Sequence, residues 1–209
     1  MRNYSILSIL FFNLLIILNS ACNHENISIS DPSQTPINAK PNPLKLTWTA
    51  FKFSNRTALN GTFDDIKITQ QIPPGNDPAD ILNGLEFDIN TGSVNTGMEF
   101  RDNNIIQFFF NYLLEGEHIK GSITATDSER EQHHCTIHLS MNDATHDVTA
   151  SYSILDKTLL LEGTLDLANW NTQSSLDMLN SHVAAYHTGS DGVNKLWSDM
   201  KFRVEYLVE

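Results

Sequence analysis

From residue 44 onward, apolar and polar side chains alternate along the chain, and this alternation leaves few folds open. It is clearest over residues 200–208, where Phe202, Val204 and Tyr206 stand between charged residues, although Leu207 interrupts the polar side. Side chains two positions apart project from the same face of a strand, so the pattern predicts a half-buried β-strand. The same period predicts strands over residues 46–50, 63–68, 85–90, 119–126, 134–141, 148–155 and 158–167.

Turn-forming residues separate most of these runs. The turn signals are Asn60-Gly61, Pro73-Pro74-Gly75-Asn76, Asn83-Gly84, Glu115-Gly116, Asn142-Asp143 and Asp156-Lys157. Connections of hairpin length favour antiparallel pairing. About eight short strands at this spacing predict an all-β barrel or sandwich.

Two segments depart from the strand pattern. Residues 96–108 are compatible with a short helix before the cluster of phenylalanines at 108–110. Residues 174–186 carry apolar side chains at helical spacing, and Ser174 with Asp177 resembles a capping box. We therefore expect one or two short helices on an otherwise β architecture.

The first 21 residues read as a signal peptide. Arg2 supplies a positive start, residues 6–18 are mostly apolar, and the small residues Ser20 and Ala21 follow. The apolar run is shorter than the ~20 residues that a membrane span needs. It has the length of the apolar region of an export signal, with cleavage expected after Ala21.

Cys22 follows the small residues directly. The stretch Leu18-Asn19-Ser20-Ala21-Cys22 resembles the bacterial lipobox, although Asn19 stands where leucine is usual. In a lipobox the cysteine is diacylated and becomes the new N-terminus, and two acyl chains anchor a protein stably. We expect lipidation of Cys22 and a place on the periplasmic face of a bacterial envelope membrane. An ordinary signal peptide with Cys22 as a bystander is the alternative.

These features predict a division of the chain into three parts: a signal peptide at 1–21, a lipidated N-terminus with a flexible tether at 22–43, and a folded domain at 44–209. The tether is polar and carries four prolines, which favour extended chain. If Cys22 is acylated, Cys135 has no partner for an intrachain disulfide. The fold must then depend on its core.

Charge and composition exclude some classes of function. Hydrophobic residues make up 40% of the chain and charged residues 18%, as in globular proteins. The formal net charge is −12, from 25 acidic against 13 basic residues. Nucleic-acid binding requires a basic surface that displaces counterions, so we expect no nucleic-acid partner.

Five segments, in this order, resemble the YceI-like family of lipid-binding proteins. They are Leu46-Thr47-Trp48-Thr49-Ala50, Leu59-Asn60-Gly61-Thr62-Phe63, Ser93-Val94-Asn95-Thr96-Gly97 with Arg101-Asp102, Ile105 and Phe109-Phe110, the hairpin from Leu139 to Val148, and Gly163-Thr164-Leu165 up to Trp170. Order and rough spacing hold from about residue 45 to 209. The chain is similar to a divergent member, because Lys52 and Asn104 replace family histidines, Asp143 and Asp147 replace a glycine and a proline, and the spacing before the paired phenylalanines is one residue short.

The resemblance implies a lipocalin-like antiparallel β-barrel whose lumen holds a polyisoprenoid or a similar long amphiphile. Such binding needs an apolar channel with a few polar groups at its mouth, and no catalytic group. The residues expected to line the lumen are Trp48, Ala50, Phe63, Ile105, Phe109, Phe110, Leu139, Met141, Leu165 and Trp170. Each of them is also compatible with a filled core. Arg101 and Asp102 are candidates for a polar headgroup, with a surface ion pair or a helix cap as the alternative.

Other chemical patterns are weak. His133, His134, Cys135 and His138 invite a metal interpretation, but successive strand positions point to opposite faces. Only two of these side chains would converge, unless His146 joins from the paired strand, so we expect no metal site. Neither a Gly-x-Ser-x-Gly elbow nor a glycine-rich phosphate loop occurs, and we expect no enzyme and no cofactor. Two hypotheses remain: an envelope-anchored lipid carrier, and a non-catalytic interaction module with a filled core.

Overall fold

The computed structural model describes residues 44–70, 78–125 and 133–207. The predicted signal peptide, the lipidation site at Cys22, the tether and the turn at 73–76 lie outside the described residues. Within the part of the chain that is described, no helix has the length and apolar character needed to cross a membrane.

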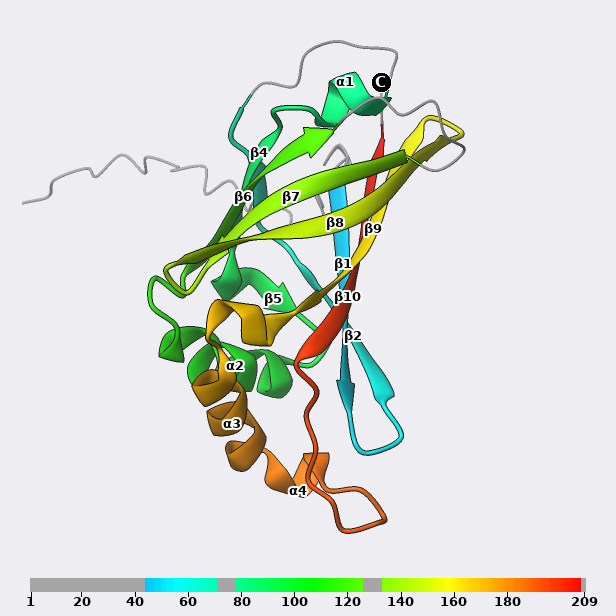
Figure 1. Ribbon diagram of the computed structural model, residues 1–209. Helices are drawn as coiled ribbons and strands as arrows, with labels where there is room; N and C mark the ends of the chain where they lie inside the picture. Colours follow the sequence, from blue (N-terminus) through cyan, green and yellow to red (C-terminus); the bar gives the residue numbers. More distant parts are fainter. Residues whose placement is uncertain (1–43, 71–77, 126–132, 208–209) are drawn as a thin grey trace, which may run out of the picture. The chain divides into compact units, whose positions relative to one another are not determined.

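One antiparallel sheet of ten strands makes up most of the domain (Figure 1). The strands are β1 (Leu44–Lys52), β2 (Thr57–Phe63), β3 (Ile66–Ile68), β4 (Glu86–Asn90), β5 (Val94–Asn95), β6 (His118–Ala125), β7 (His133–Met141), β8 (Ala144–Leu155), β9 (Thr158–Asp166) and β10 (Asp199–Leu207). The helices are α1 (Pro78–Leu82), α2 (Glu99–Phe108), α3 (Gln173–His182) and α4 (Ala184–His187), with 3-10 turns η1 (Thr91–Ser93), η2 (Phe110–Tyr112) and η3 (Leu167–Trp170).

The order of strands in the sheet is β3-β4-β6-β7-β8-β9-β10-β1-β2-β5. Strands β2 and β3 are two halves of one chain pass, and so are β4 and β5. The ten strands are therefore eight passes of the chain, in agreement with the predicted number. Because β2 pairs with β5 and β3 pairs with β4, the sheet returns to its own first strands.

A kink at Asp64-Asp65 divides the first of these passes, which the sequence pattern had predicted as one strand. Hydrogen bonds continue across the kink: the amide of Asp64 donates to the carbonyl of Ser93 (3.0 Å), and the amide of Asn90 donates to that of Asp65 (3.0 Å). The side-chain amide of Asn90 also donates to the Asp65 carboxylate (3.1 Å). The backbone at the kink is thus paired although the strand is broken, and the sheet curls into a lipocalin-like barrel.

The predicted turn at Asn60-Gly61 is wrong, because both residues lie inside β2. The connection between β1 and β2 comes earlier, where Phe53 and Arg56 have positive φ angles of 62° and 58°. Gly61 is opposite Trp48 in the β1–β2 ladder, and the indole ring occupies the space of its missing side chain. This glycine therefore serves packing and not a turn.

Four other predicted turns are confirmed. The two-residue connections Asn142-Asp143 and Asp156-Lys157 have positive φ angles at both positions, as tight hairpins of the type I′ class require. Gly84 and Glu115 also have positive φ angles, of 80° and 50°. These short turns fix the register of the long β7–β8–β9 meander.

Alternation along the strands separates an inner from an outer face. On β7, Cys135, Ile137, Leu139 and Met141 are buried, and the residues between them are more exposed. Inward-facing residues of β1 and β10 such as Ala50 are apolar but only half-buried. Half-burial of an inward apolar face indicates that this side of the barrel encloses space.

The helices lie at the two ends of the sheet (Figure 1). α1 packs on β6 and β8 at one end, with Ile81 and Leu82 buried. α2 packs against α3 at the other end. The predicted helix at 174–186 is divided at Val183 into α3 and α4, and the predicted capping box does not form: no side chain caps α3, and Asp177 instead accepts from Gln173 Nε2 (2.7 Å).

Candidate functional site

The barrel encloses a cavity of about 450 Å³ whose wall is almost entirely apolar. Its lining reaches from Ile81 and Leu82 of α1 to Phe100 of α2 and Tyr186 of α4. The cavity thus runs between the two ends of the barrel that the helices cover. Its volume lies in the ~300–1,000 Å³ range of ordinary ligand pockets.

Ten of the eleven residues predicted to contact a ligand line this cavity. They are Trp48, Ala50, Phe63, Arg101, Ile105, Phe109, Phe110, Leu139, Met141 and Leu165. They come from strands on several sides of the barrel and from α2 and η2, so the fold brings together segments that are distant in sequence. Whether each contacts a ligand stays a prediction.

Trp170 is the exception, and its placement in the lumen is wrong. It ends η3, is 1% exposed, and does not line the cavity. Its indole Nε1 donates to the carbonyl of Leu139 (2.9 Å), and its ring meets that of His146 edge-on at 5.3 Å. The 3-10 turn after β9 rotates the residue out of the strand period, so Trp170 fills the core beside the β7–β8 hairpin.

The two residues predicted to contact a polar headgroup, Arg101 and Asp102, differ in their surroundings. Asp102 accepts hydrogen bonds from the amide (2.8 Å) and the hydroxyl (2.5 Å) of Thr96, which ties the segment after β5 to α2. Arg101 lines the cavity, and none of the described residues forms a hydrogen bond or ion pair with its guanidinium. Asp102 is thus structural, and Arg101 is the one of the pair available to a ligand.

Polar side chains gather where α2 and α4 meet the end of β1. Lys52, Arg101, Asn104 and His187 all line the cavity, and we call this group the polar end of the cavity. Lys52 Nζ donates to the carbonyl of Tyr186 (3.2 Å) and lies 4.6 Å from the centre of the Phe53 ring. These contacts hold the ammonium group at the cavity wall.

His187 is neutral at ordinary pH because of its position. Burial, and after it the charge of Lys52, lowers the pKa of its imidazole from 6.5 to about 4. Its Nδ1 lies 2.9 Å from Oδ1 of Asn180 in α3. The imidazole therefore adds a polar but uncharged group to the polar end of the cavity.

Sequence reasoning missed part of this site. Lys52 and Asn104 attracted notice only as departures from family histidines, and both prove to face the cavity. The other two departures, Asp143 and Asp147, lie in or beside the β7–β8 turn and do not line the cavity, so a departure from the family's pattern does not by itself mark a site residue. Tyr186 and His187 had no such signal, because their place depends on the break between α3 and α4.

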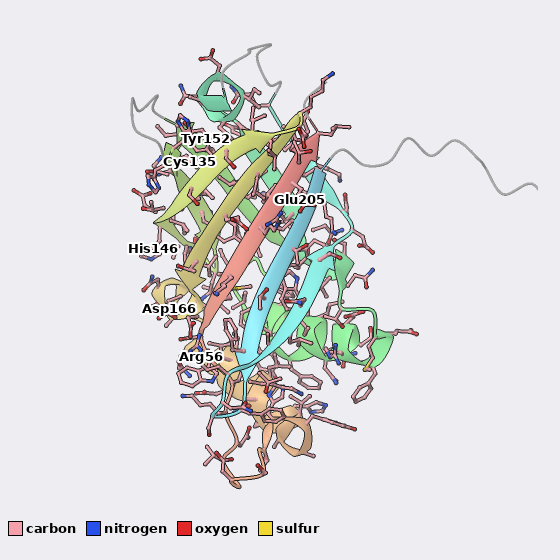
Figure 2. All side chains as sticks on the ribbon, turned by 90° about the vertical axis from the view of Figure 1, so that its right-hand side faces the viewer. Arg56, Cys135, His146, Tyr152, Asp166 and Glu205 are labelled. Atoms are coloured by element: carbon pink, nitrogen blue, oxygen red, sulfur yellow. The ribbon has the colours of Figure 1, made fainter. Side chains whose placement is uncertain are left out.

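A third cation near this end of the barrel, Arg56, already has an acidic partner. Arg56, which Figure 2 labels at the barrel end beside α3 and α4, donates to the Asp199 carboxylate through both terminal guanidinium nitrogens, Nη1 and Nη2. Its guanidinium also lies between the rings of Phe51 (4.5 Å) and Trp197 (4.4 Å). This cluster joins the β1–β2 turn to the start of β10 and leaves Arg56 outside the cavity lining.

The histidines of β7 point as the strand period predicts. His138 faces outward, with Nδ1 2.6 Å from Asp147 and Nε2 3.1 Å from Thr124. Cys135 faces inward, and burial raises the pKa of its thiol to about 11. Among the described residues, no group of three or more His, Cys, Asp or Glu side chains is placed to hold a metal ion.

An antiparallel sheet curled around one long apolar cavity defines a lipocalin-like binding protein. The family model of the YceI-like domain matches residues 30–195, and the chain belongs to this family. No curated protein matches the chain significantly.

Solved structures share the fold at low sequence identity. A polyisoprenoid binding domain from Saccharophagus degradans is 12% identical, with a TM-score of 0.53, over 79% of this chain and 94% of that one. BcnA of Burkholderia cenocepacia is 10% identical, with a TM-score of 0.51, over 78% and 94%. The YCEI protein of Campylobacter jejuni is 18% identical, with a TM-score of 0.50, over 74% and 86%.

Proposed function

We propose that this protein binds and carries a long apolar lipid in the lumen of its barrel. One observation carries the proposal: a cavity of about 450 Å³, lined almost wholly by apolar side chains, extends between the barrel's two ends. Water in such a space finds few hydrogen-bond partners, so an apolar chain that displaces it binds favourably. Each Å² of apolar surface buried contributes about 25 cal/mol, so a long chain needs no catalytic or charged group to bind.

A slender chain suits the wall better than a compact ligand. Most inward apolar residues of β1 and β10 are half-buried, among them Leu46, Ala50, Phe202 and Val204, whereas Trp48 is buried. A polyisoprenoid-like chain extended along them would cover these side chains and complete the core. The relative from Saccharophagus degradans is described as a polyisoprenoid binding domain, which supports the same ligand class here.

Membrane anchoring is the second part of the proposal. The signal-peptide pattern ending in Ser20-Ala21-Cys22 supports acylation of Cys22 and attachment to the periplasmic face of an envelope membrane. The polar, proline-containing segment that follows would then serve as a tether for the barrel. Such an anchor keeps a lipid carrier next to the source of its ligand.

The alternative function is a non-catalytic interaction module with a filled core. A filled core would leave no space among Trp48, Phe63 and Leu139, whereas these side chains line an open cavity. The cavity therefore favours lipid carriage over the interaction module.

The test uses the full chain carrying Cys22→Ser, which removes the acylation site. The protein is purified from a bacterial host, measured by native mass spectrometry, and its lipids are extracted and identified. We expect a stoichiometric lipid adduct of polyisoprenoid type. An apo mass that persists after incubation with prenyl lipids would overturn the proposal.

A pair of matched variants shows whether the lipid occupies the cavity. Ala50 lines the wall on β1, so Ala50→Phe fills the lumen and should abolish the adduct. Ala58 lies on the neighbouring strand β2, is exposed, and stands outside the cavity lining. Ala58→Phe adds the same side chain to the outer surface and should keep the adduct, which separates occupancy of the cavity from surface binding.

A further inference from the structure

We propose that the lipid carries an anionic head, a carboxylate or a phosphate, which binds between Lys52 and Arg101 at the polar end of the cavity and accepts a hydrogen bond from Asn104. This inference rests on the proposed function and adds the chemical class of the ligand and its orientation. The apolar tail then runs toward Ile81 and Leu82 of α1.

Asn104 is the first observation behind this assignment. It is 7% exposed, lines the cavity from α2, and its side-chain amide has no hydrogen-bond partner among the described residues. Buried polar side chains are hydrogen-bonded in the great majority of cases. An amide that is buried, unpartnered and open to a cavity therefore points to a ligand with a polar group at this place.

The sign of the charges is the second observation. The described part of the chain contributes two cationic side chains to the cavity wall, Lys52 and Arg101, and contributes no Asp or Glu to it. The whole chain has a formal net charge of −12, with more acidic than basic residues. The charged residues of the cavity wall are therefore opposite in sign to the net charge of the chain. Neither cation has an acidic partner among the described residues, so an anionic ligand can form charge-assisted hydrogen bonds with both.

Contacts between the elements bring the polar groups to one end. The ring of Phe100 in α2 meets the ring of Tyr186 in α4 at 6.2 Å. The carbonyl of Tyr186 in turn accepts from Lys52 Nζ at 3.2 Å. Arg101 lies in the same turn of α2 as Phe100 and lines the same cavity as Lys52, so α2 and β1 both contribute a cation to this cavity.

Neighbouring groups leave these two cations available. Two further cations near this barrel end stand outside the cavity lining: Arg56 pairs with Asp199, and Lys195 lies 4.7 Å from the centre of the Trp197 ring. Asp102 is bound to Thr96 and does not line the cavity. His187 is uncharged at neutral pH and lies at the wall as a hydrogen-bonding group.

The experiment compares ligands with the same tail and different heads. The full chain carrying Cys22→Ser is stripped of lipid, and affinities are measured by titration calorimetry for geranylgeranyl phosphate against geranylgeraniol, and for palmitate against hexadecanol. We expect the anionic member of at least one pair to bind about tenfold more tightly or better, as charge-assisted hydrogen bonds imply. The pair with the larger preference identifies the head as phosphate or carboxylate.

Variants then locate the head. Lys52→Gln with Arg101→Gln should remove the preference for the anion while the affinity for the neutral alcohol changes less than about threefold. Lys201→Gln removes one positive charge from an exposed position of β10 outside the cavity lining, and it should keep the preference. Thermal unfolding of each variant shows that the barrel is intact.

The outcomes separate this inference from the proposed function. Equal affinity for anion and alcohol in both pairs, with binding still blocked by Ala50→Phe, would overturn the anionic head and leave lipid carriage in place. Preference that survives the double variant would overturn the assignment to Lys52 and Arg101. Failure of all four ligands to bind would overturn both proposals.

Discussion

The indole ring of Trp48 covers Gly61 so closely that any β-carbon at Gly61 would overlap its six-membered ring. The two residues face each other in the β1–β2 ladder, and Trp48 Nε1 donates to the carbonyl of Thr62 (3.3 Å). Trp48 is 7% exposed and lines the cavity. A glycine on one strand thus sets the position of an aromatic wall residue on the next.

Substitution Gly61→Ala should therefore destabilise the barrel. The indole has to move into the cavity or the strands have to separate, and overpacking of this kind costs about 1–3 kcal/mol. Urea denaturation measures the change in the free energy of unfolding. Ala58→Ser, at an exposed position of the same strand, is the control and should change stability by less than about 0.5 kcal/mol. An unchanged stability of Gly61→Ala would contradict the packing described here.

Asp102→Ala should loosen the segment that joins β5 to α2. The Asp102 carboxylate accepts two hydrogen bonds from Thr96, and their loss should cost about 1–3 kcal/mol. Glu99→Ala removes the same charge from an exposed position of the same helix and is the matched control. Chemical denaturation of both variants checks the prediction, which fails if they lose equal stability.

The pH dependence of stability should carry a contribution from His187. Its pKa in the folded state is about 4, mainly because of burial, against 6.5 for an exposed histidine. Between these values the unfolded chain binds more protons than the folded one, so stability rises with pH over this window and is lost as the pH falls through it. Partial exposure of the side chain reduces the contribution to about 1–2 kcal/mol.

The variant His187→Asn removes this titration. We expect its free energy of unfolding to fall less than that of the unsubstituted protein when the pH is lowered from 7 to about 4. Denaturation curves at intermediate pH values give the comparison. Parallel profiles for the two proteins would contradict the placement of His187 at the cavity wall.

Asn104→Leu should stabilise the lipid-free protein and weaken binding of an anionic ligand. The substitution removes an amide without a partner among the described residues, and leucine is the better helix former. Asn103→Leu gives the same gain in helix propensity at an exposed position and is the control. The free energy of unfolding should increase by about 0.5–1 kcal/mol more in Asn104→Leu than in Asn103→Leu. The opposite order would show that Asn104 is satisfied within the protein.

Cys135 should react slowly with thiol reagents in the folded protein. Its side chain is 4% exposed, and burial raises its pKa to about 11, so the thiolate is present only at high pH. In the Cys22→Ser background it is the remaining cysteine of the chain. At pH 8 the reaction with a disulfide reagent should be slower by about a hundredfold or more than in urea-unfolded protein. Equal rates would place Cys135 at the surface.

Periodicity determined the class of fold and most strands, because side-chain alternation is a local property of an extended backbone. Tight turns such as Asn142-Asp143 were also readable, since positive φ angles restrict the residues that a two-residue hairpin accepts. Gly61 was misread because a glycine in a strand signals either a turn or a close neighbour. Only the partner strand, with Trp48 opposite, decides between them.

The site was predictable on its apolar side and less so at its polar end. Inward residues of strands such as Leu139 and Met141 follow from the period, whereas Trp170 left the lumen because a 3-10 turn changed its direction. The polar end is formed by β1, α2 and α4, which are distant in sequence. Lys52 and Tyr186, which share a hydrogen bond there, are 134 residues apart. The sequence by itself determined which faces are apolar. The tertiary structure decided that these faces enclose a cavity and that Lys52, Arg101 and Asn104 all line it, because closure of the sheet and packing of helices are non-local events.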